Sequence, residues 1–361
     1  MSNLRIEAIT STTERRKLSI PFKTAQHTVT TMDAVLVTVR LSDGSTGVGA
    51  ATPNAVVTGD TLTSLHAVID EVLTPALLHA DFARWEDLLA SLDHAIHGNS
   101  AAKAGVEIAL WDLRAQQLGV PLYELLGGDA DYMVTDWTVG IADEDVMRTQ
   151  AQRIAAAGFN AVKIKVGGAD LATDLDHIQA IAAAVGPKVK LRLDANQGWT
   201  VRQAQRAIQA IAALHLPVEF VEQPVLASDR AGLAAVTASS PLPIMADEAL
   251  FSPADAQELL RMHACDYLNI KLMKTGGLAG AERINAIAEL NGVQCMIGCM
   301  IESRIGIAAA VAFAAAHRNV VFADLDAAFM LKEPETGGFT QQQNALHCLH
   351  VPGLGFERIK S

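Results

Sequence analysis

Three lysines and three acidic residues stand in strand-like runs of this chain, at positions that indicate shared chemistry. Lys163 and Lys165 lie in one apolar run, and Lys271 lies in another. Between them, three runs each end in an acid: Asp194, Glu222 and Asp247. Three carboxylates without a thiolate or imidazole suit a hard cation such as Mg²⁺. A lysine on each flank suits two acid/base groups that act on opposite faces of one carbon.

The spacing of these positions matches a repeated strand–helix unit. From Lys163 to Lys271, successive chemical positions lie 24 to 31 residues apart, about the length of one strand, one helix and their connections. Alanine-rich helical stretches separate eight strand-like runs. These runs are 134–139, 161–166, 190–194, 218–222, 244–247, 267–271, 294–298 and 320–324. Eight strands that alternate with helices over this length predict a TIM-type α/β barrel.

The polar residues fall at the carboxyl ends of their strands. This holds for Asp194, Glu222, Asp247, Lys271 and Asp324. In a barrel these ends converge on one mouth, where the active site lies. A doubly wound open sheet could hold as many strands, but it would not bring five strand ends around one ion. The barrel is therefore the favoured architecture.

The N-terminal third follows a different pattern, which predicts an α+β unit. Two β-branched runs, 34–40 and 46–50, flank Ser42-Asp-Gly-Ser45, a hairpin signal. From about Thr61 to Gly119 the apolar period becomes helical. A small antiparallel sheet followed by helices is expected.

The lysine pair has a chemical rationale. Side chains two apart in a strand share a face, so Lys163 and Lys165 are neighbours. Their repulsion is expected to lower the pKa of at least one of them, which a base requires. Lys165 is the expected base because it lies nearer the strand end. Lys163 is expected to modulate it or to contact the substrate carboxylate, and Lys271 enters from across the barrel.

The competing interpretation is structural. An acid at a strand end often caps the following helix, and a lone lysine often makes a surface salt bridge. All these residues stand in one register, which disfavours the structural interpretation. Burying a charged lysine in an apolar strand also costs free energy, which favours a functional role for these lysines. Glu248, next to Asp247, is expected to point elsewhere.

Five stretches match the motifs of one enzyme family, and together they are specific. They are Val162-Lys-Ile-Lys-Val-Gly167, Leu191-Arg-Leu-Asp-Ala-Asn-Gln-Gly-Trp199, Val221-Glu-Gln-Pro224, Met245-Ala-Asp-Glu248 and Asn269-Ile-Lys-Leu-Met-Lys-Thr-Gly-Gly277. Over nearly its whole length the chain resembles the muconate-lactonising-enzyme subgroup of the enolase superfamily. The resemblance implies an α+β capping domain over 1–125, to which 330–361 returns. It also implies a modified (β/α)₇β barrel over 126–329.

The resemblance also implies a mechanism. Superfamily members use lysine or histidine bases with Mg²⁺. One Mg²⁺ held by the three carboxylates would stabilise an ene-diolate formed from the substrate. Lys165 and Lys271 would then transfer a proton from one face and to the other, which inverts the Cα centre.

Asp324 and Asp326 indicate which activity of this subgroup the chain has. Two acids on one strand face can clamp an α-ammonium group, and Asp324-Leu-Asp326 is similar to the pattern of dipeptide epimerases. Epimerisation of the C-terminal residue of a dipeptide is therefore the favoured function. N-acylamino acid racemase or o-succinylbenzoate synthase activity is a same-fold alternative. A non-catalytic binding or structural barrel is an alternative of another class.

Several residues are expected to contact the substrate. Family members that prefer Ala-Glu carry an arginine where this chain has His27, and histidine cannot fork a γ-carboxylate. A broader or apolar dipeptide set is therefore plausible beside Ala-Glu. Loops around 21–31 and 52–60 are expected to close over the mouth. Glu302, Asp136 and Thr138 are expected to line the site.

Composition excludes other classes of function. The net charge of −12 disfavours nucleic acid and anionic membranes as partners. The uncharged run 305–316 is too short to span a bilayer and predicts a buried helix. The N-terminus has no targeting pattern, so a cytoplasmic location with reduced, structural cysteines is expected. A homo-oligomer that acts on a small dipeptide is expected.

Overall fold

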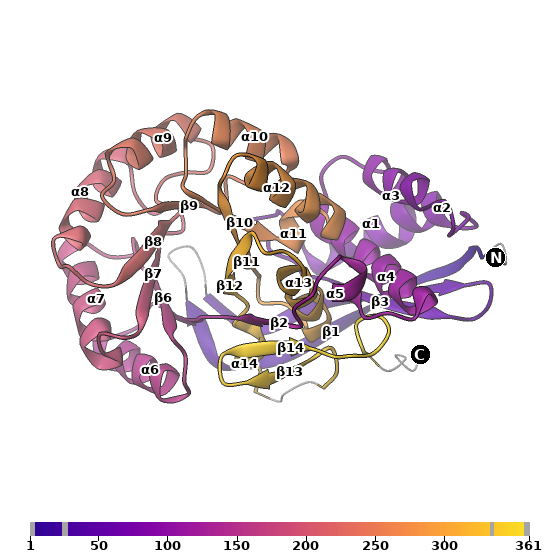
Figure 1. The fold of residues 1–361 in the computed structure, drawn as a ribbon, viewed down its shortest axis with the longest axis horizontal. Helices are drawn as coiled ribbons and strands as arrows, with labels where there is room; N and C mark the ends of the chain where they lie inside the picture. The colour runs from indigo at the N-terminus through magenta and orange to yellow at the C-terminus, as the bar shows by residue number, and fades with distance from the viewer. Residues whose placement is uncertain (1–3, 24–27, 333–335, 357–361) are drawn as a thin grey trace.

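The chain folds into a parallel barrel with an antiparallel sheet and its helices packed beside it (Figure 1). The computed structural model describes residues 4–23, 28–332 and 336–356. None of the helices in this described part has the length and apolarity needed to span a bilayer.

Eight parallel strands form the barrel in the order β12-β11-β10-β9-β8-β7-β6-β5. Hydrogen bonds from Asp136 N to Ala323 O (3.2 Å) and from Leu325 N to Thr135 Oγ1 (2.8 Å) bring the two edges together. The predicted barrel is confirmed. The strands are β5 (Trp137–Val139), β6 (Ala161–Lys165), β7 (Lys190–Asp194), β8 (Val218–Glu222), β9 (Ile244–Ala246), β10 (Tyr267–Lys271), β11 (Gln294–Gly298) and β12 (Val320–Asp324).

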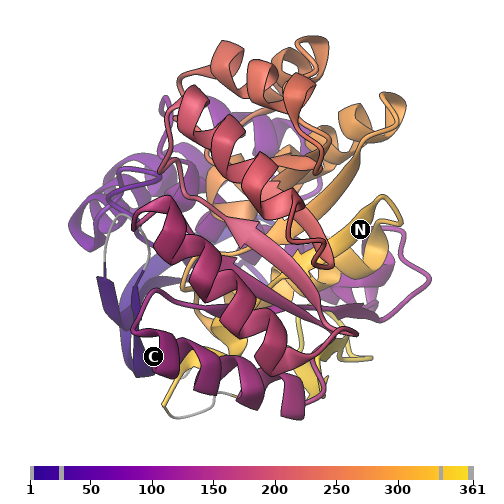
Figure 2. The same cartoon turned by 90° about the vertical axis from the view of Figure 1, so that its left-hand side faces the viewer.

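Helices cover the outside of the barrel, and Figure 2 shows several of them lying side by side over the strands. Local sequence sets their starts: Thr200 and Ser252 each form a capping box with the third helical residue. The predicted buried helix 305–316 corresponds to α13. The helices are α6 (Glu144–Ala156), α7 (Leu171–Val185), α8 (Val201–Ala212), α9 (Arg230–Ser239), α10 (Pro253–Arg261), α11 (Leu272–Thr275), α12 (Leu278–Leu290), α13 (Arg304–Ala316) and α14 (Ala327–Met330).

The N-terminal unit is an antiparallel sheet with helices, as predicted. Strands β1 (Ile6–Lys23), β2 (Thr28–Leu41) and β3 (Thr46–Ala51) pair in chain order. The predicted hairpin turn joins β2 to β3, with Gly44 at φ 83°. The helices are α1 (Leu62–Val68), the π-helical turn η1 (Ile69–Leu73), α2 (Thr74–Leu77), α3 (Trp85–His94), α4 (Ser100–Leu118) and α5 (Leu122–Leu125).

Helix α4 joins this cap to the barrel. A Cβ on Gly49 of β3 would lie 2.0 Å from the Gly105 carbonyl oxygen, so only glycine lets the helix approach the sheet this closely. On its other side α4 contacts α11 and α12. The Glu107 carboxylate accepts from Ala279 N at 3.0 Å, near the start of α12. The cap therefore packs directly on the segment that follows β10.

The predicted strand 134–139 is wrong in part, because the structure divides it. Strand β4 (Tyr132–Val134) pairs with β14 (Ala345–Cys348), which pairs with β13 (Phe339–Gln342), and only β5 joins the barrel. Between β4 and β5, Thr135 and Asp136 bind β12 and its following turn instead of extending either strand.

The C-terminal segment contacts both parts of the molecule. Leu331 bridges to Leu18 of β1, and Leu354 N donates to the Asp112 carboxylate of α4 at 2.7 Å. Strand β14 meanwhile pairs with β4, the strand just before β5, and β13 pairs with β14. The exact domain limits at 125/126 and 329/330 remain a prediction.

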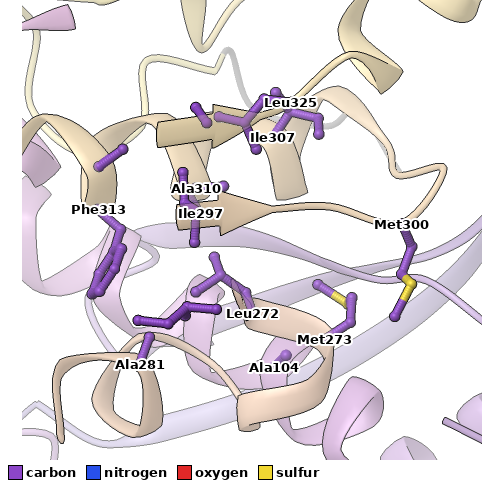
Figure 3. Close-up of a cluster of buried hydrophobic side chains, with 14 of the residues drawn as sticks. Ala104, Leu272, Met273, Ala281, Ile297, Met300, Ile307, Ala310, Phe313 and Leu325 are labelled. Carbon is purple, nitrogen blue, oxygen red and sulfur yellow. The ribbon is translucent and has the colours of Figure 1, made fainter. Parts of the chain in front are cut away.

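Apolar side chains fill the space between barrel and helices. Leu272 and Met273 of α11 pack near Ile297 of β11 and Phe313 of α13 (Figure 3). All four cysteines are free thiols, and Cys265, Cys295 and Cys348 are buried.

Candidate active site

A cavity of about 370 Å³ opens at the carboxyl ends of the barrel strands, between barrel and cap. The cap contributes the ends of β1 and β2 and the loop after β3. These cap residues include Phe22, Thr28 to Thr31, and Thr52 to Val57. The barrel contributes Thr138, Lys163, Lys165, Asp247, Lys271, Asp324 and Asp326, among others.

Strand register places the predicted residues side by side. Lys165 pairs with Asp194, and Asp194 pairs with Glu222, across β6, β7 and β8. On the other side of the barrel Lys271 pairs with Gly298 of β11. A Cβ on Gly298 would meet Lys271 Cε at 2.9 Å, so this glycine leaves room for the lysine to enter the cavity.

Lys163 is the centre of a buried cluster of charges. Its Nζ lies 3.0 Å from Asp194 Oδ2, 2.8 Å from Glu222 Oε2 and 2.6 Å from Asp324 Oδ2. Burial alone lowers the pKa of Lys163, but Asp194 and Asp324 outweigh burial and raise that pKa well above its ordinary value. The lowering expected of at least one of the two lysines is therefore not found at Lys163, because carboxylates on neighbouring strands surround its ammonium group.

Lys165 and Lys271 reach the cavity from opposite sides. Strands β6 and β10 are four positions apart in the sheet order of eight. Lys165 Nζ lies 2.6 Å from Asp194 Oδ2, and Lys271 Nζ lies 2.8 Å from Asp247 Oδ2. Two amines therefore flank the same group of carboxylates.

The acids at the mouth outnumber the lysines, and their mutual repulsion contributes to raised pKa values. Burial and then the Asp194 charge raise the pKa of Glu222 to about 8. Burial and then the Asp247 charge raise the pKa of Glu248 to about 7. Six buried carboxylates share the mouth: Asp194, Glu222, Asp247, Glu248, Asp324 and Asp326. Four lysines face them: Lys163, Lys271 and Lys274, which are buried, and Lys165, which is partly buried. When all are ionised, the remaining charge equals that of one divalent cation.

The donor set has the chemistry of a magnesium site. Asp194, Glu222 and Asp247 are almost fully buried on neighbouring strands, and Mg²⁺ prefers such oxygen ligands. Within the described ranges, no three histidine, cysteine or acidic side chains are arranged as a metal cage. In the structure lysine ammonium groups lie on the carboxylate oxygens instead. The metal ligands therefore remain a prediction that the excess negative charge supports.

Two predicted substrate contacts, Asp136 and Glu302, are not among the residues that line this cavity. Asp136 is fully buried, and its Oδ2 accepts from Arg192 Nη1 at 2.8 Å. It shares a face with Thr138, which does line the cavity, but it lies deeper in the barrel. Glu302 lies behind the loop that follows β11, where its Oε1 accepts from Met300 N at 2.9 Å. Neither residue is among those that line this cavity, and a substrate contact by Asp136 or Glu302 stays a prediction.

The other predicted contacts fall as follows. Asp324 and Asp326 line the cavity, and Asp326 Oδ2 accepts from Thr138 N at 2.8 Å. His27 lies outside the described residues. Glu248 was expected to point elsewhere, yet it lines the cavity and accepts from Asn196 Nδ2 at 3.2 Å. Strand β9 ends at Ala246, so side chains no longer alternate at Glu248.

The sequence interpretation missed Lys274. This fully buried lysine donates to Asp247 Oδ1 and to the Asp247 carbonyl, both at 2.5 Å. Asp247 therefore accepts a hydrogen bond from Lys274 at Oδ1 and another from Lys271 at Oδ2. The sequence could have indicated it, because Lys274 stands three residues after Lys271 in the family motif 269–277.

Comparisons with known proteins identify the family. A family model described as "Enolase C-terminal domain-like" matches residues 146–359. "Mandelate racemase / muconate lactonizing enzyme, N-terminal domain" matches residues 5–127. The chain belongs to this family. The chain is 47% identical to an L-Ala-D/L-Glu epimerase of Bacillus subtilis, over 94% of this chain and 93% of that protein. It is 40% identical to a hydrophobic dipeptide epimerase of Enterococcus faecalis, over 98% and 99% of the two chains.

Solved structures of this family share the fold. A substrate-liganded complex of the Bacillus subtilis L-Ala-D/L-Glu epimerase matches with a TM-score of 0.95 and 46% identity, over 97% of this chain and 98% of that one. The Enterococcus faecalis dipeptide epimerase, in complex with Mg and L-Leu-L-Tyr, matches with a TM-score of 0.93 and 39% identity, over 97% and 99%. The predicted family, fold and enzyme class, an isomerase of the epimerase type, are confirmed.

The buried Glu302 generates a prediction about pH and stability. Burial, more than any other cause, raises the pKa of Glu302 from 4.5 to about 7. A carboxyl group that holds its proton more tightly when folded contributes most stability below its unfolded pKa. That contribution is lost as pH rises through the folded pKa. Glu302→Gln removes this titration and keeps an oxygen for Met300 N.

Relative to Glu302→Gln, wild type should therefore lose on the order of 3 kcal/mol of unfolding free energy between about pH 5 and pH 8. Urea denaturation at several pH values measures the difference. Parallel profiles for the two proteins would show that Glu302 does not titrate in this range.

Proposed function

We propose that this chain is a Mg²⁺-dependent dipeptide epimerase that inverts the Cα of the C-terminal residue. The observation that carries the proposal is the placement of Lys165 and Lys271 on opposite sides of one cavity. One amine can remove a proton from one face of a carbon, while the other returns a proton to the opposite face. Relatives at 40% identity or more are named dipeptide or L-Ala-D/L-Glu epimerases.

Asp194, Glu222 and Asp247 are the residues that would hold one Mg²⁺. When bound, the cation supplies Lewis-acid stabilisation of the negative charge that develops on the substrate carboxylate as its α proton leaves. The excess of acids over lysines at the mouth supports a divalent cation. Two related dipeptide epimerases, from Enterococcus faecalis and Cytophaga hutchinsonii, have structures in complex with Mg.

Asp324 and Asp326 would bind the α-ammonium group of the dipeptide. Both carboxylates are buried in the cavity wall, and Asp324 Oδ1 accepts no hydrogen bond within the described structure. Thr138 N fixes Asp326, while Lys163 fixes the other oxygen of Asp324. A free ammonium group would satisfy the unpartnered oxygen. N-acylated substrates lack that group, which disfavours racemase or synthase activity of the same subgroup.

Lys165 and Lys271 would exchange roles according to the epimer that enters. Each lysine is close to a carboxylate and nine-tenths or more buried, so each is held in place. Burial also keeps bulk water from exchanging the transferred proton. Lys163 sits beneath Lys165 and keeps the surrounding carboxylates in register.

The two-lysine mechanism makes a direct prediction. Lys165→Ala and Lys271→Ala should each lower the turnover of epimerisation by about 10²–10⁴-fold, because each removes one proton-transfer group. The measurement is the rate of change in optical rotation with a dipeptide substrate. Lys190→Ala is the matched control, because this exposed lysine lies at the opposite end of β7 from the site. Wild-type turnover in either site variant would remove that lysine from the mechanism.

The cavity wall indicates the kind of side chain that the substrate carries. The cations among the described lining residues are Lys163, Lys165 and Lys271, and no arginine lies among them. These lysines already face the acids of the mouth. The cap side presents apolar side chains such as Phe22 and Val29, several threonine hydroxyls, and the polar Asp33 and Asn54. We infer that neutral or apolar C-terminal residues are accepted at least as well as glutamate, so the set extends beyond Ala-Glu.

A dipeptide library in deuterated water tests this substrate range. Deuterium should enter the Cα of the C-terminal residue in several L,L-dipeptides with apolar or neutral residues, as mass spectrometry would report. N-acylamino acids and the precursor of o-succinylbenzoate serve as controls and should stay unchanged. Label in Ala-Glu alone would contradict the broad range. Exchange only in N-acylamino acids would contradict the proposed function. A cytoplasmic location and a homo-oligomer remain predictions from the sequence.

A further inference from the structure

The cap loop that follows β3 is held in shape by Asn54. Its Oδ1 accepts from Val56 N at 3.1 Å and from Val57 N at 3.0 Å. Its carbonyl oxygen accepts from Thr58 N at 3.0 Å and from Gly59 N at 2.9 Å. One asparagine therefore satisfies four amides of the same turn. The loop, residues 52–60, keeps its conformation through its own hydrogen bonds and needs an anchor only to fix its position.

Two methionine sulfurs of the barrel supply this anchor. Asn54 Nδ2 donates to Met300 Sδ at 3.4 Å, and Thr52 N donates to Met273 Sδ at 3.3 Å. Met273 lies on α11, two residues beyond Lys271, and Met300 follows β11 (Figure 3). Both methionines are at least nine-tenths buried. The loop is thus attached to the strand ends on the Lys271 side of the mouth.

We propose that Asn54 and Met300 are a positioning pair that holds the loop closed over the Lys271 side of the cavity before substrate binds. Residues 52–57 of the loop line the cavity together with Lys271 and Glu248. Attachment therefore fixes one wall of the site and excludes water there. Because an amide–sulfur hydrogen bond is weak, the closed position is favoured and still reversible.

Met300 is itself held from behind, which makes it a firm anchor. Its backbone N–H donates to Glu302 Oε1 at 2.9 Å, which fixes the turn in which Met300 lies, and both residues are buried. The contact chain runs from Glu302 through Met300 to Asn54. A protein whose binding-competent state is only partly populated binds with reduced apparent affinity. Loss of the pair should therefore raise KM more than it lowers kcat.

Two variants remove the contact between Asn54 and Met300 while they leave the hydrogen bonds within the turn in place. Asn54→Asp keeps an oxygen acceptor for Val56 N and Val57 N but cannot donate to the sulfur. Met300→Leu keeps the volume and removes the acceptor. The double variant measures the coupling between the two side chains. Met147→Leu is the matched control, because Met147 is equally buried on α6, far from the cap loop along the chain.

Hydrogen exchange of the cap loop, without substrate, is the first readout. The Thr52 amide, whose hydrogen bond to Met273 Sδ requires the loop to stay attached, should exchange about fivefold faster in each single variant, the effect of one lost hydrogen bond. The double variant should be no faster than the singles, because both break one contact. Unchanged exchange in either single variant, multiplied effects in the double variant, or equal acceleration in Met147→Leu would each overturn the proposal.

Steady-state kinetics is the second readout, and this part rests on the proposed dipeptide epimerase activity. KM should rise about fivefold in both single variants, with kcat within about twofold of wild type. A lower kcat at unchanged KM would overturn a positioning role. If no dipeptide is epimerised, the proposed function fails, whereas hydrogen exchange still decides whether Asn54 and Met300 anchor the loop.

Discussion

The structure depends on one constraint: six buried carboxylates meet three buried lysines and one partly buried lysine at the mouth of a barrel. Ionised groups removed from water are costly unless each has a partner of opposite charge. Lys163 meets this demand for three acids at once, with Nζ 3.0 Å or less from Asp194, Glu222 and Asp324. The acids that remain in excess are what a divalent cation would neutralise. The ion pairs that make the buried charges tolerable therefore also hold the proposed catalytic groups in place.

The rest of the fold keeps these charges in register. Parallel pairing aligns Lys165, Asp194 and Glu222 on adjacent strands, and Gly298 leaves the space through which Lys271 enters. The cap completes the site because α4 packs on the segment that carries Lys271 and Lys274, while the loop after β3 rests on two methionines of the barrel. The segment that carries Lys274 is thus held by the barrel strand before it and by a helix of the cap.

Much of this arrangement follows from local sequence pattern, and the exceptions have physical causes. Strand periodicity and the convergence of strand ends were enough to place Asp194, Glu222, Asp247, Lys271 and Asp324 at one mouth. The pattern does not show how deep a side chain lies in the barrel, so it could not tell that Asp136 and Glu302 are absent from the lining of this cavity. It holds only within a strand, so it failed for Glu248 beyond the end of β9. The pattern also does not show which side chains meet in three dimensions. It therefore missed the carboxylates that raise the pKa of Lys163, and it missed the contact of Lys274 with Asp247.

The binding of a divalent cation by Asp194, Glu222 and Asp247 is the central claim, and calorimetric titration with Mg²⁺ tests it most directly. Asp33→Asn is a suitable control, because Asp33 lines the same cavity outside the group of buried acids. The account predicts one Mg²⁺ per chain for wild type and for Asp33→Asn, and an affinity at least about tenfold lower for Asp194→Asn. No heat of binding in wild type, or undiminished affinity in Asp194→Asn, would contradict it.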